Sequence, residues 1–88
     1  MDILTLDRLT VGEAGRVCFL KAKGSMRRRM IDLGLVDGTL IECVGKSPSG
    51  DPSAYLIRGA VIAIRSFDAA TVGVKLCKEE DKTDGTYQ

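Results

Sequence analysis

The chain has 88 residues, of which 44% are apolar and 28% charged, a size and composition that suit one small globular domain and exclude a disordered segment. The net charge is +1, and residues 1–77 carry only +3 (eleven basic against eight acidic side chains), which excludes the dense positive patch of a dedicated nucleic-acid-binding domain. Histidine is absent and no GxxxxGK[ST] motif is present. We therefore predict that the chain is not an enzyme and holds no cofactor.

The N-terminal segment places Leu4, Leu6 and Leu9 around the charged pair Asp7 and Arg8. Its pattern fits a strand or a helix equally well, so we expect only that it covers one end of the domain. Further along, short apolar runs alternate with Gly-, Pro- and Asp-rich turns, which is typical of small sandwiches and barrels. Five strands are predicted, over residues 15–21, 39–45, 53–58, 60–65 and 71–76.

One segment between the first two strands has helical periodicity. Met26, Met30 and Leu33 fall at i, i+4 and i+7 and so share one face of a helix of about two turns. Ser25 is the expected N-cap, and Gly34 stands where a left-handed residue would end the helix. Such a short helix is marginal alone, so its Met/Leu face should pack on the sheet, although thioethers could also form an adaptable binding surface.

The predicted strands 53–58 and 60–65 are separated only by the Arg58-Gly59 turn region, which is too short for a crossover helix, so they must pair antiparallel. The fold class is therefore mainly β, a small barrel of about five strands with a short α-helical insertion. Residues 1–77 should form this domain, and the polar stretch 78–88 (KEEDKTDGTYQ) should be a disordered tail.

Three cysteines, Cys18, Cys43 and Cys77, lack the CxxC spacing of a metal site and are dispersed on or directly after predicted strands. With no histidine available, a site of two histidines and one carboxylate is excluded, so we expect buried thiols and no metal site. An odd number of cysteines suits a reducing compartment. The N-terminus lacks a basic region followed by an apolar one, and no apolar window spans a membrane, so a cytoplasmic location is expected.

A series of short motifs runs through the chain in a fixed order: Gly-x-x-Gly, GSMRRRM, DLGL, GT, PSGDP, RG, AIR and VGV. They occupy residues 12–15, 24–30, 32–35, 38–39, 48–52, 58–59, 63–65 and 72–74. Each is weak alone, but together, over roughly residues 4–76, they resemble the FeoA family. Met30 stands where that family more often has leucine, an exchange that conserves volume.

The resemblance implies an SH3-like barrel that acts as a cytosolic adaptor, binding and modulating FeoB, a membrane Fe²⁺ transporter with a cytosolic GTP-binding region. The same barrel occurs in repressors of the diphtheria-toxin-repressor class. An iron-linked transcriptional regulator or nucleic-acid-binding module is therefore the alternative function, although we expect no nucleic acid partner and no membrane insertion. A metallochaperone that carries Fe²⁺ through its thiols is a third hypothesis.

Two segments are candidates for the partner-binding surface. Arg27, Arg28 and Arg29 form a basic helix face suited to acidic side chains of a protein partner, or simply a solvated face. Pro48 and Pro52 restrict the loop over residues 46–52, which also carries Asp51 as a candidate contact and either frames a binding surface or is a rigid connector. The sequence leaves both alternatives open.

Overall fold

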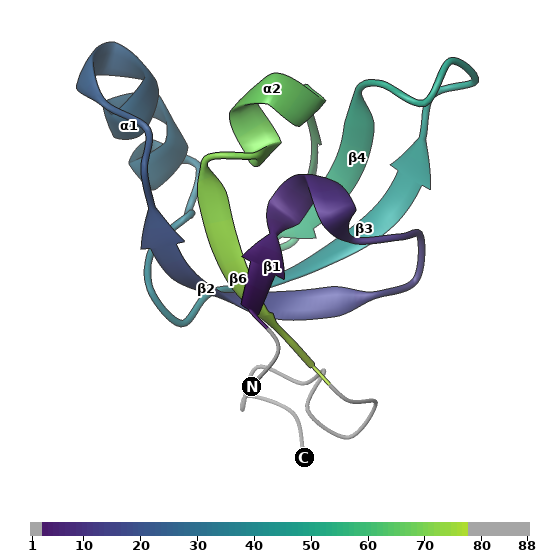
Figure 1. Ribbon diagram of the computed structural model, residues 1–88, viewed down its shortest axis with the longest axis horizontal. Coiled ribbons are helices and arrows are strands. Elements are labelled where there is room, and N and C mark those ends of the chain that lie inside the picture. The colour runs from purple at the N-terminus through teal and green to yellow at the C-terminus, as the bar shows by residue number, and fades with distance from the viewer. Residues whose placement is uncertain (1–2, 78–88) are drawn as a thin grey trace.

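A computed structural model describes residues 3–77 (Figure 1). Six strands form one sheet: β1 (Ile3–Thr5), β2 (Ala14–Leu20), β3 (Leu40–Lys46), β4 (Ser53–Ile57), β5 (Ala60–Ile64) and β6 (Val72–Leu76). Three short helices accompany it: the 3-10 helix η1 (Leu6–Arg8), α1 (Gly24–Asp32) and α2 (Ser66–Ala69). No helix among the described residues has both the length and the apolar character needed to cross a membrane.

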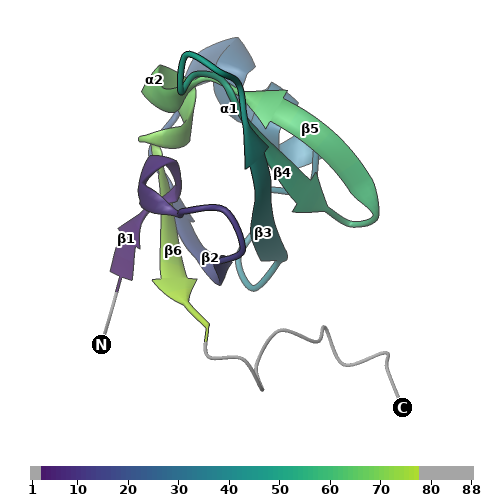
Figure 2. The same cartoon turned by 90° about the vertical axis from the view of Figure 1, so that its right-hand side faces the viewer.

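The sheet has the strand order β1-β6-β2-β3-β4-β5, and every neighbouring pair is antiparallel. Register shifts between Val17 and Phe19 in β2, and between Cys43 and Gly45 in β3, mark bulges that help the sheet curl around its core (Figure 2). The predicted fold class is confirmed. The structure adds the four-residue α2, and it answers the question left open at the N-terminus with both elements, the strand β1 followed by the 3-10 helix η1.

The core lies inside the curled sheet and is almost entirely aliphatic, with Tyr55 as its one fully buried aromatic side chain in the described range. Val72 and Val74 point inward from β6, as period-two alternation predicts. Leu6 and Leu9 close one end of the core and are fully buried. The N-terminal segment therefore does cover the barrel, through η1 and the turn after it.

Helix α1 begins two residues earlier than expected, and the prediction of Ser25 as its N-cap is wrong. Lys23 occupies the N-cap in extended conformation and makes no side-chain capping bond, because an ammonium group cannot accept a hydrogen bond; Gly24 follows with a positive φ of 63°. The predicted end at Gly34 is confirmed, with a φ of 106°. The Leu35 N–H donates to the Met30 carbonyl at 3.0 Å, and both side chains are buried, which is the Schellman arrangement.

The β2–β6 side of the sheet is packed unusually closely. A Cβ on Gly15 would lie 2.9 Å from the Lys75 carbonyl oxygen, and one on Gly73 would overlap the Phe19 ring. Glycine at position 15 therefore lets the two strands approach each other, and glycine at position 73 leaves room for the Phe19 ring. Tyr55 links β4 to η1, because its hydroxyl donates to the Leu6 carbonyl at 3.4 Å.

Candidate functional site

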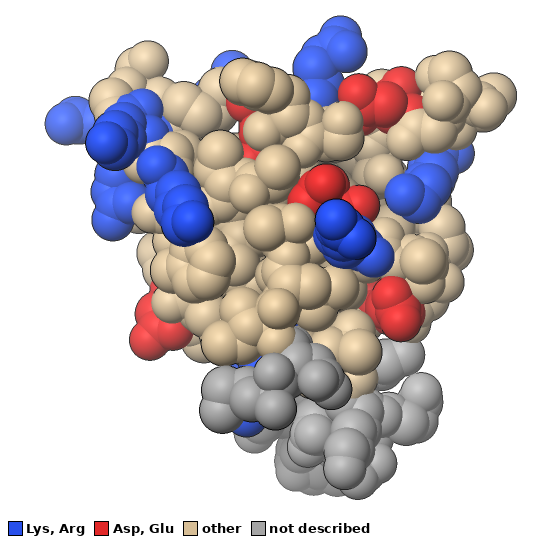
Figure 3. Space-filling view, viewed as in Figure 1, with Lys and Arg blue, Asp and Glu red and all other residues tan. Residues whose placement is uncertain are grey.

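Lysine and arginine side chains gather over α1, at the upper left of the space-filling view (Figure 3). Arg27, Arg28 and Arg29 are all on the surface there. They do not have the same surroundings, however. Arg27 donates from Nη1 to the Leu20 carbonyl at 2.7 Å, which ties the start of the helix to the end of β2, so this arginine has a structural role of its own.

The other two arginines face different hollows. Arg28 borders a shallow depression with Gly24, Arg27, Ile31 and Asp32. Arg29 instead lines a cleft of about 290 Å³ between α1, β5 and the start of α2. Arg27 and Arg28 thus share one depression, although only Arg27 is tied to Leu20, and of the three adjacent arginines only Arg29 reaches the cleft.

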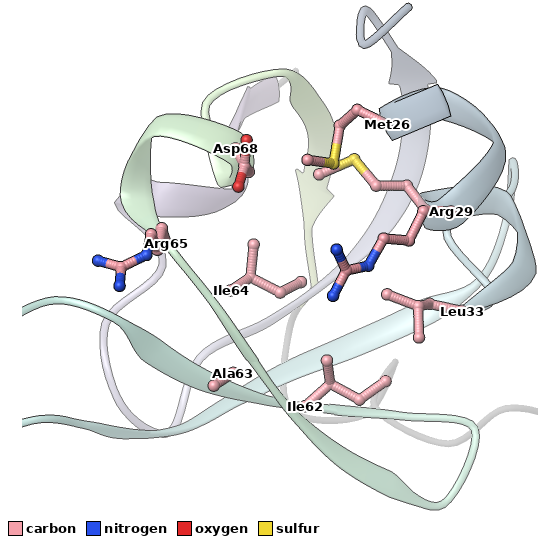
Figure 4. Close-up of a pocket in the computed structure, with 9 residues that line it drawn as sticks. Met26, Arg29, Leu33, Ile62, Ala63, Ile64, Arg65 and Asp68 are labelled. Atoms are coloured by element: carbon pink, nitrogen blue, oxygen red, sulfur yellow. The ribbon is translucent and has the colours of Figure 1, made fainter. Parts of the chain in front are cut away.

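The cleft has an apolar floor and charged margins (Figure 4). Its lining residues are Met26, Arg29, Met30, Leu33, Ile62, Ala63, Ile64, Arg65 and Asp68. Figure 4 shows the Arg29 guanidinium group reaching over the cleft toward β5, while Arg65 points outward. Met30 is core, with 2% exposure, whereas Met26 is only partly buried and faces the cleft. The core prediction is therefore confirmed for Met30, whereas an adaptable binding surface stays a hypothesis for Met26.

The loop between β3 and β4 contains the other three candidate residues. Asp51 is exposed, and Pro48 and Pro52 lie beside it on the same loop. The Asp51 carboxylate accepts hydrogen bonds from the Ser66 N–H at 2.8 Å and from the Ser66 hydroxyl at 3.3 Å. Asp51 therefore attaches the loop to the start of α2, which favours the rigid-connector interpretation for that residue and leaves Pro48 as the candidate contact on the loop.

The arginines and the loop lie at the same end of the molecule, but they are not in one cluster. Figure 1 shows α1 at the upper left and the loop at the upper right, with α2 between them. The cleft lies on the α1 side of α2. A partner that contacts both predicted segments would have to extend across α2, where Phe67 is 86% exposed.

The thiols and carboxylates of residues 3–77 form no compact ligand set: no three Cys, Asp or Glu side chains in that range lie close enough to hold a metal ion. Cys43 is buried, and Cys18 and Cys77 are partly buried. Absence of a metal site stays a prediction. Among titratable groups, burial raises the pKa of Tyr55 above its usual value.

Comparison with known proteins matches residues 4–76 to the FeoA domain. The chain belongs to the FeoA family. It is 30% identical over 73 residues to an Fe(2+) transport protein A/Fe(2+) transporter FeoB fusion protein of Porphyromonas gingivalis. The matched segment covers 83% of this chain but spans only 9% of the length of that fusion protein. The chain thus corresponds to a small part of that curated relative.

Solved structures of FeoA proteins share the fold. A FeoA-like protein of Clostridium acetobutylicum has a TM-score of 0.80 at 29% identity, covering 90% of this chain and 92% of its own. The FeoA of Stenotrophomonas maltophilia, described as an SH3 domain protein and complexed with zinc, has a TM-score of 0.74 at 28% identity, with coverages of 82% and 89%. The SH3-like architecture predicted by the family resemblance is therefore confirmed.

A manganese-dependent transcriptional repressor has a TM-score of 0.78 at 17% identity, and the match covers 88% of this chain and 42% of the repressor. At that identity the likeness establishes a common fold alone. It carries no argument that this FeoA protein binds DNA, and the alternative function of a transcriptional regulator stays a hypothesis.

The sequence located α1 and its arginines but missed the cleft beside them. The cleft combines Met26 and Leu33 of the α1 region with Ile62 of β5 and Asp68 of α2, residues that lie far apart in the chain. The sequence carried part of a signal, because Ile62 and Ile64 share a strand face, but only the structure shows that Ile62 is partly buried. An apolar strand face that the core covers only in part indicates a neighbouring hollow.

Proposed function

We propose that this FeoA protein is a cytoplasmic, non-enzymatic accessory protein of ferrous iron uptake that binds the cytosolic region of a FeoB-type transporter and modulates it. Nucleic acid is not its partner in this proposal. The exposed face of α1 with Arg28 and Arg29 supplies the main contact, and Pro48 on the β3–β4 loop supplies a second one. Arg27 contributes by anchoring the helix.

The observation that carries the proposal is the covalent connection of a FeoA domain to FeoB in the Porphyromonas gingivalis relative. A single polypeptide keeps two modules at a high effective concentration, which is useful when they act together. The chemistry of α1 agrees with a protein partner, because exposed arginines form paired hydrogen bonds with carboxylates and are enriched at interfaces. Residues 1–77 carry a charge of only +3, which suits an acidic protein surface better than a phosphate backbone.

The test is the affinity of the purified protein for a detergent-solubilised FeoB-type transporter and for its isolated cytosolic GTPase region. We expect the double variant Arg28→Ala/Arg29→Ala to bind about tenfold more weakly, since interface arginines commonly contribute on the order of 1–2 kcal/mol. Arg27 is left intact because its loss would disturb the helix anchor. The matched control is Arg8→Ala/Lys75→Ala, which removes the same charge from exposed residues on η1 and β6.

The control variant should bind within about twofold of the wild type, because exposed charges away from the contact act only through weak, screened fields. Equal weakening of both variants would mean that net charge, not the α1 face, determines binding. If the wild-type protein binds neither the intact transporter nor its GTPase region, the accessory function itself is refuted.

A further inference from the structure

Strand β5 lies at one end of the sheet, and within the described chain its only strand partner is β4 (Figure 2). Its five residues, AVIAI, include no charge and no proline. Natural proteins usually protect an edge strand with lysine, proline, a bulge or a covering segment, because a free edge is a template for another strand. The edge of β5 has none of the protections that sequence could give it.

The backbone groups at this edge can be assigned from the register. Ile57 and Ala60 flank a two-residue turn, so they form the closing hydrogen-bonded pair of the hairpin. Antiparallel pairs alternate, so Ile62 again bonds to β4. The N–H and C=O groups of Val61 and Ala63 therefore point away from β4, and no turn or loop in residues 3–77 pairs with them.

The cleft described above runs along this same edge. Three consecutive residues of β5, Ile62, Ala63 and Ile64, line it. Alternate residues of a strand point to opposite faces, so one cleft can be lined by all three only where it reaches the edge of the strand. Met26 and Leu33 form the facing wall from the α1 side, so a strand added to β5 would place its inward side chains against them.

The charge around the cleft indicates which kind of added strand could bind at this edge. The cleft contains Arg29, Arg65 and Asp68, and thus one net positive charge, and Arg28 adds another on the same helix as Arg29. A second copy of this chain, paired β5 to β5 about a twofold axis, would bring the arginines of both copies to one interface, where like charges repel. An extended segment with acidic side chains meets no such repulsion and gains pairing with Arg29.

We propose that the free edge of β5 binds an extended, acidic segment of a partner protein as an additional strand, with Val61 and Ala63 supplying backbone hydrogen bonds and Arg29 pairing with a carboxylate. Strand addition takes affinity from main-chain bonds and specificity from side-chain pockets. The proposal rests on the proposed function in one respect, namely that the segment belongs to the transporter.

The first test does not require the transporter. The probe is a short, acetylated peptide that alternates valine and glutamate, titrated into isotope-labelled protein while amide NMR shifts are recorded. We expect shifts at Val61, Ala63 and α1, and no comparable shifts with a peptide that has lysine in place of glutamate. Equal binding of both peptides, shifts confined to another surface, or no binding would each overturn the proposal.

Two variants of Ala63 separate the backbone from the side chain. Ala63→Pro removes the outward N–H, and proline is tolerated on an edge strand when its nitrogen faces solvent. Ala63→Val also enlarges the side chain but keeps the N–H. The proline variant should bind the peptide at least about fivefold more weakly, and the valine variant should bind it within about twofold of the wild type. Well-dispersed amide NMR spectra of both variants would confirm that they are folded.

The arginines give a second matched pair, because Arg29 lines the cleft and Arg28 does not. Arg29→Ala should weaken peptide binding about two- to fivefold, since the pair is partly exposed, and Arg28→Ala should not. A concentration-dependent dimer in sedimentation that Ala63→Pro abolishes would assign the edge to a second copy instead. Binding of the transporter equally to wild type and Ala63→Pro would refute strand addition and leave the accessory function standing.

Discussion

At the β1 edge of the sheet, the strand is three residues long and leads at once into η1, whereas the five-residue apolar strand at the β5 edge leaves its outer backbone groups unpaired beside a cleft. On the β1 side, Leu6 and Leu9 are fully buried, and Gly15 allows β2 and β6 to touch. On the β5 side, α1 is held at a distance and the space between is open. One side of this FeoA domain is closely packed, and the other leaves the backbone groups of an edge strand unpaired within the described chain.

The largest expected difference in stability between the two sides comes from truncating one leucine on each. Leu6→Ala should lower the free energy of unfolding by about 2–5 kcal/mol, because a fully buried leucine leaves a cavity that a packed core cannot refill. Leu33→Ala is its partner in the cleft wall, where the side chain is only partly buried, and should cost less than about 2 kcal/mol. Urea unfolding of both variants measures the difference.

If the two leucine variants lose similar stability, α1 and the cleft wall belong to the core as much as η1 does. The distinction between a stabilising and a binding side would then be lost.

A smaller effect should come from adding one methyl group to a strand on each side. Gly15→Ala places a Cβ 2.9 Å from a backbone oxygen and should destabilise the protein by about 1–3 kcal/mol, since overpacking moves the strands apart. Gly45→Ala is the matched control in β3, because its Cβ would lie at an ordinary distance of 3.9 Å from Ala54 Cβ. Thermal unfolding should shift for the first variant and hardly for the second.

The contact between Tyr55 and η1 provides the third and smallest effect, which depends on pH. Burial raises the pKa of Tyr55 above 10.0, so the unfolded chain loses this proton at a lower pH than the folded protein does. The stability that the neutral hydroxyl contributes is therefore fully present below about pH 10 and is lost as the pH rises through the folded value. Unfolding free energies measured from about pH 8 to pH 11 should fall more steeply for wild type than for Tyr55→Phe.

Near neutral pH the same variant should lose less than about 1 kcal/mol, because it gives up a single long hydrogen bond to the Leu6 carbonyl. Lysines titrate in both proteins and cancel in the comparison. Parallel pH profiles would show that Tyr55 is solvated in the folded state.

Sequence reasoning worked where a local pattern determines the structure. Gly34 ends α1 because the chain there needs a left-handed residue, and the apolar repeat before it identifies the buried face of the helix. Alternation in β6 identifies Val72 and Val74 as core. The start of α1 was misplaced because Ser25 has the right chemistry for a cap, but the backbone turns two residues sooner, at Lys23.

The remaining features depend on distance in space, not on local pattern. The four residues of α2 are too few for helical periodicity, and β1 is too short for strand alternation. The run Arg27-Arg28-Arg29 does not itself indicate which side chain anchors the helix and which reaches the cleft. Arg27 bonds to the end of β2 and Arg29 faces β5, so both contacts depend on elements that are distant in the chain. Asp51 likewise looks available for a partner in the sequence, because its contact with Ser66 joins two separate parts of the chain.

The pairing of Ile3 with Lys75 brings the first and last described strands side by side in β1 and β6. Both ends of the described fold therefore leave from the same place, at the lower edge in Figure 1, away from α1 and the cleft. Such a domain can be spliced onto another polypeptide through either end, or inserted into a loop of one, without rearranging its core. A tether attached there would leave the β5 edge facing outward, toward whatever the host protein presents.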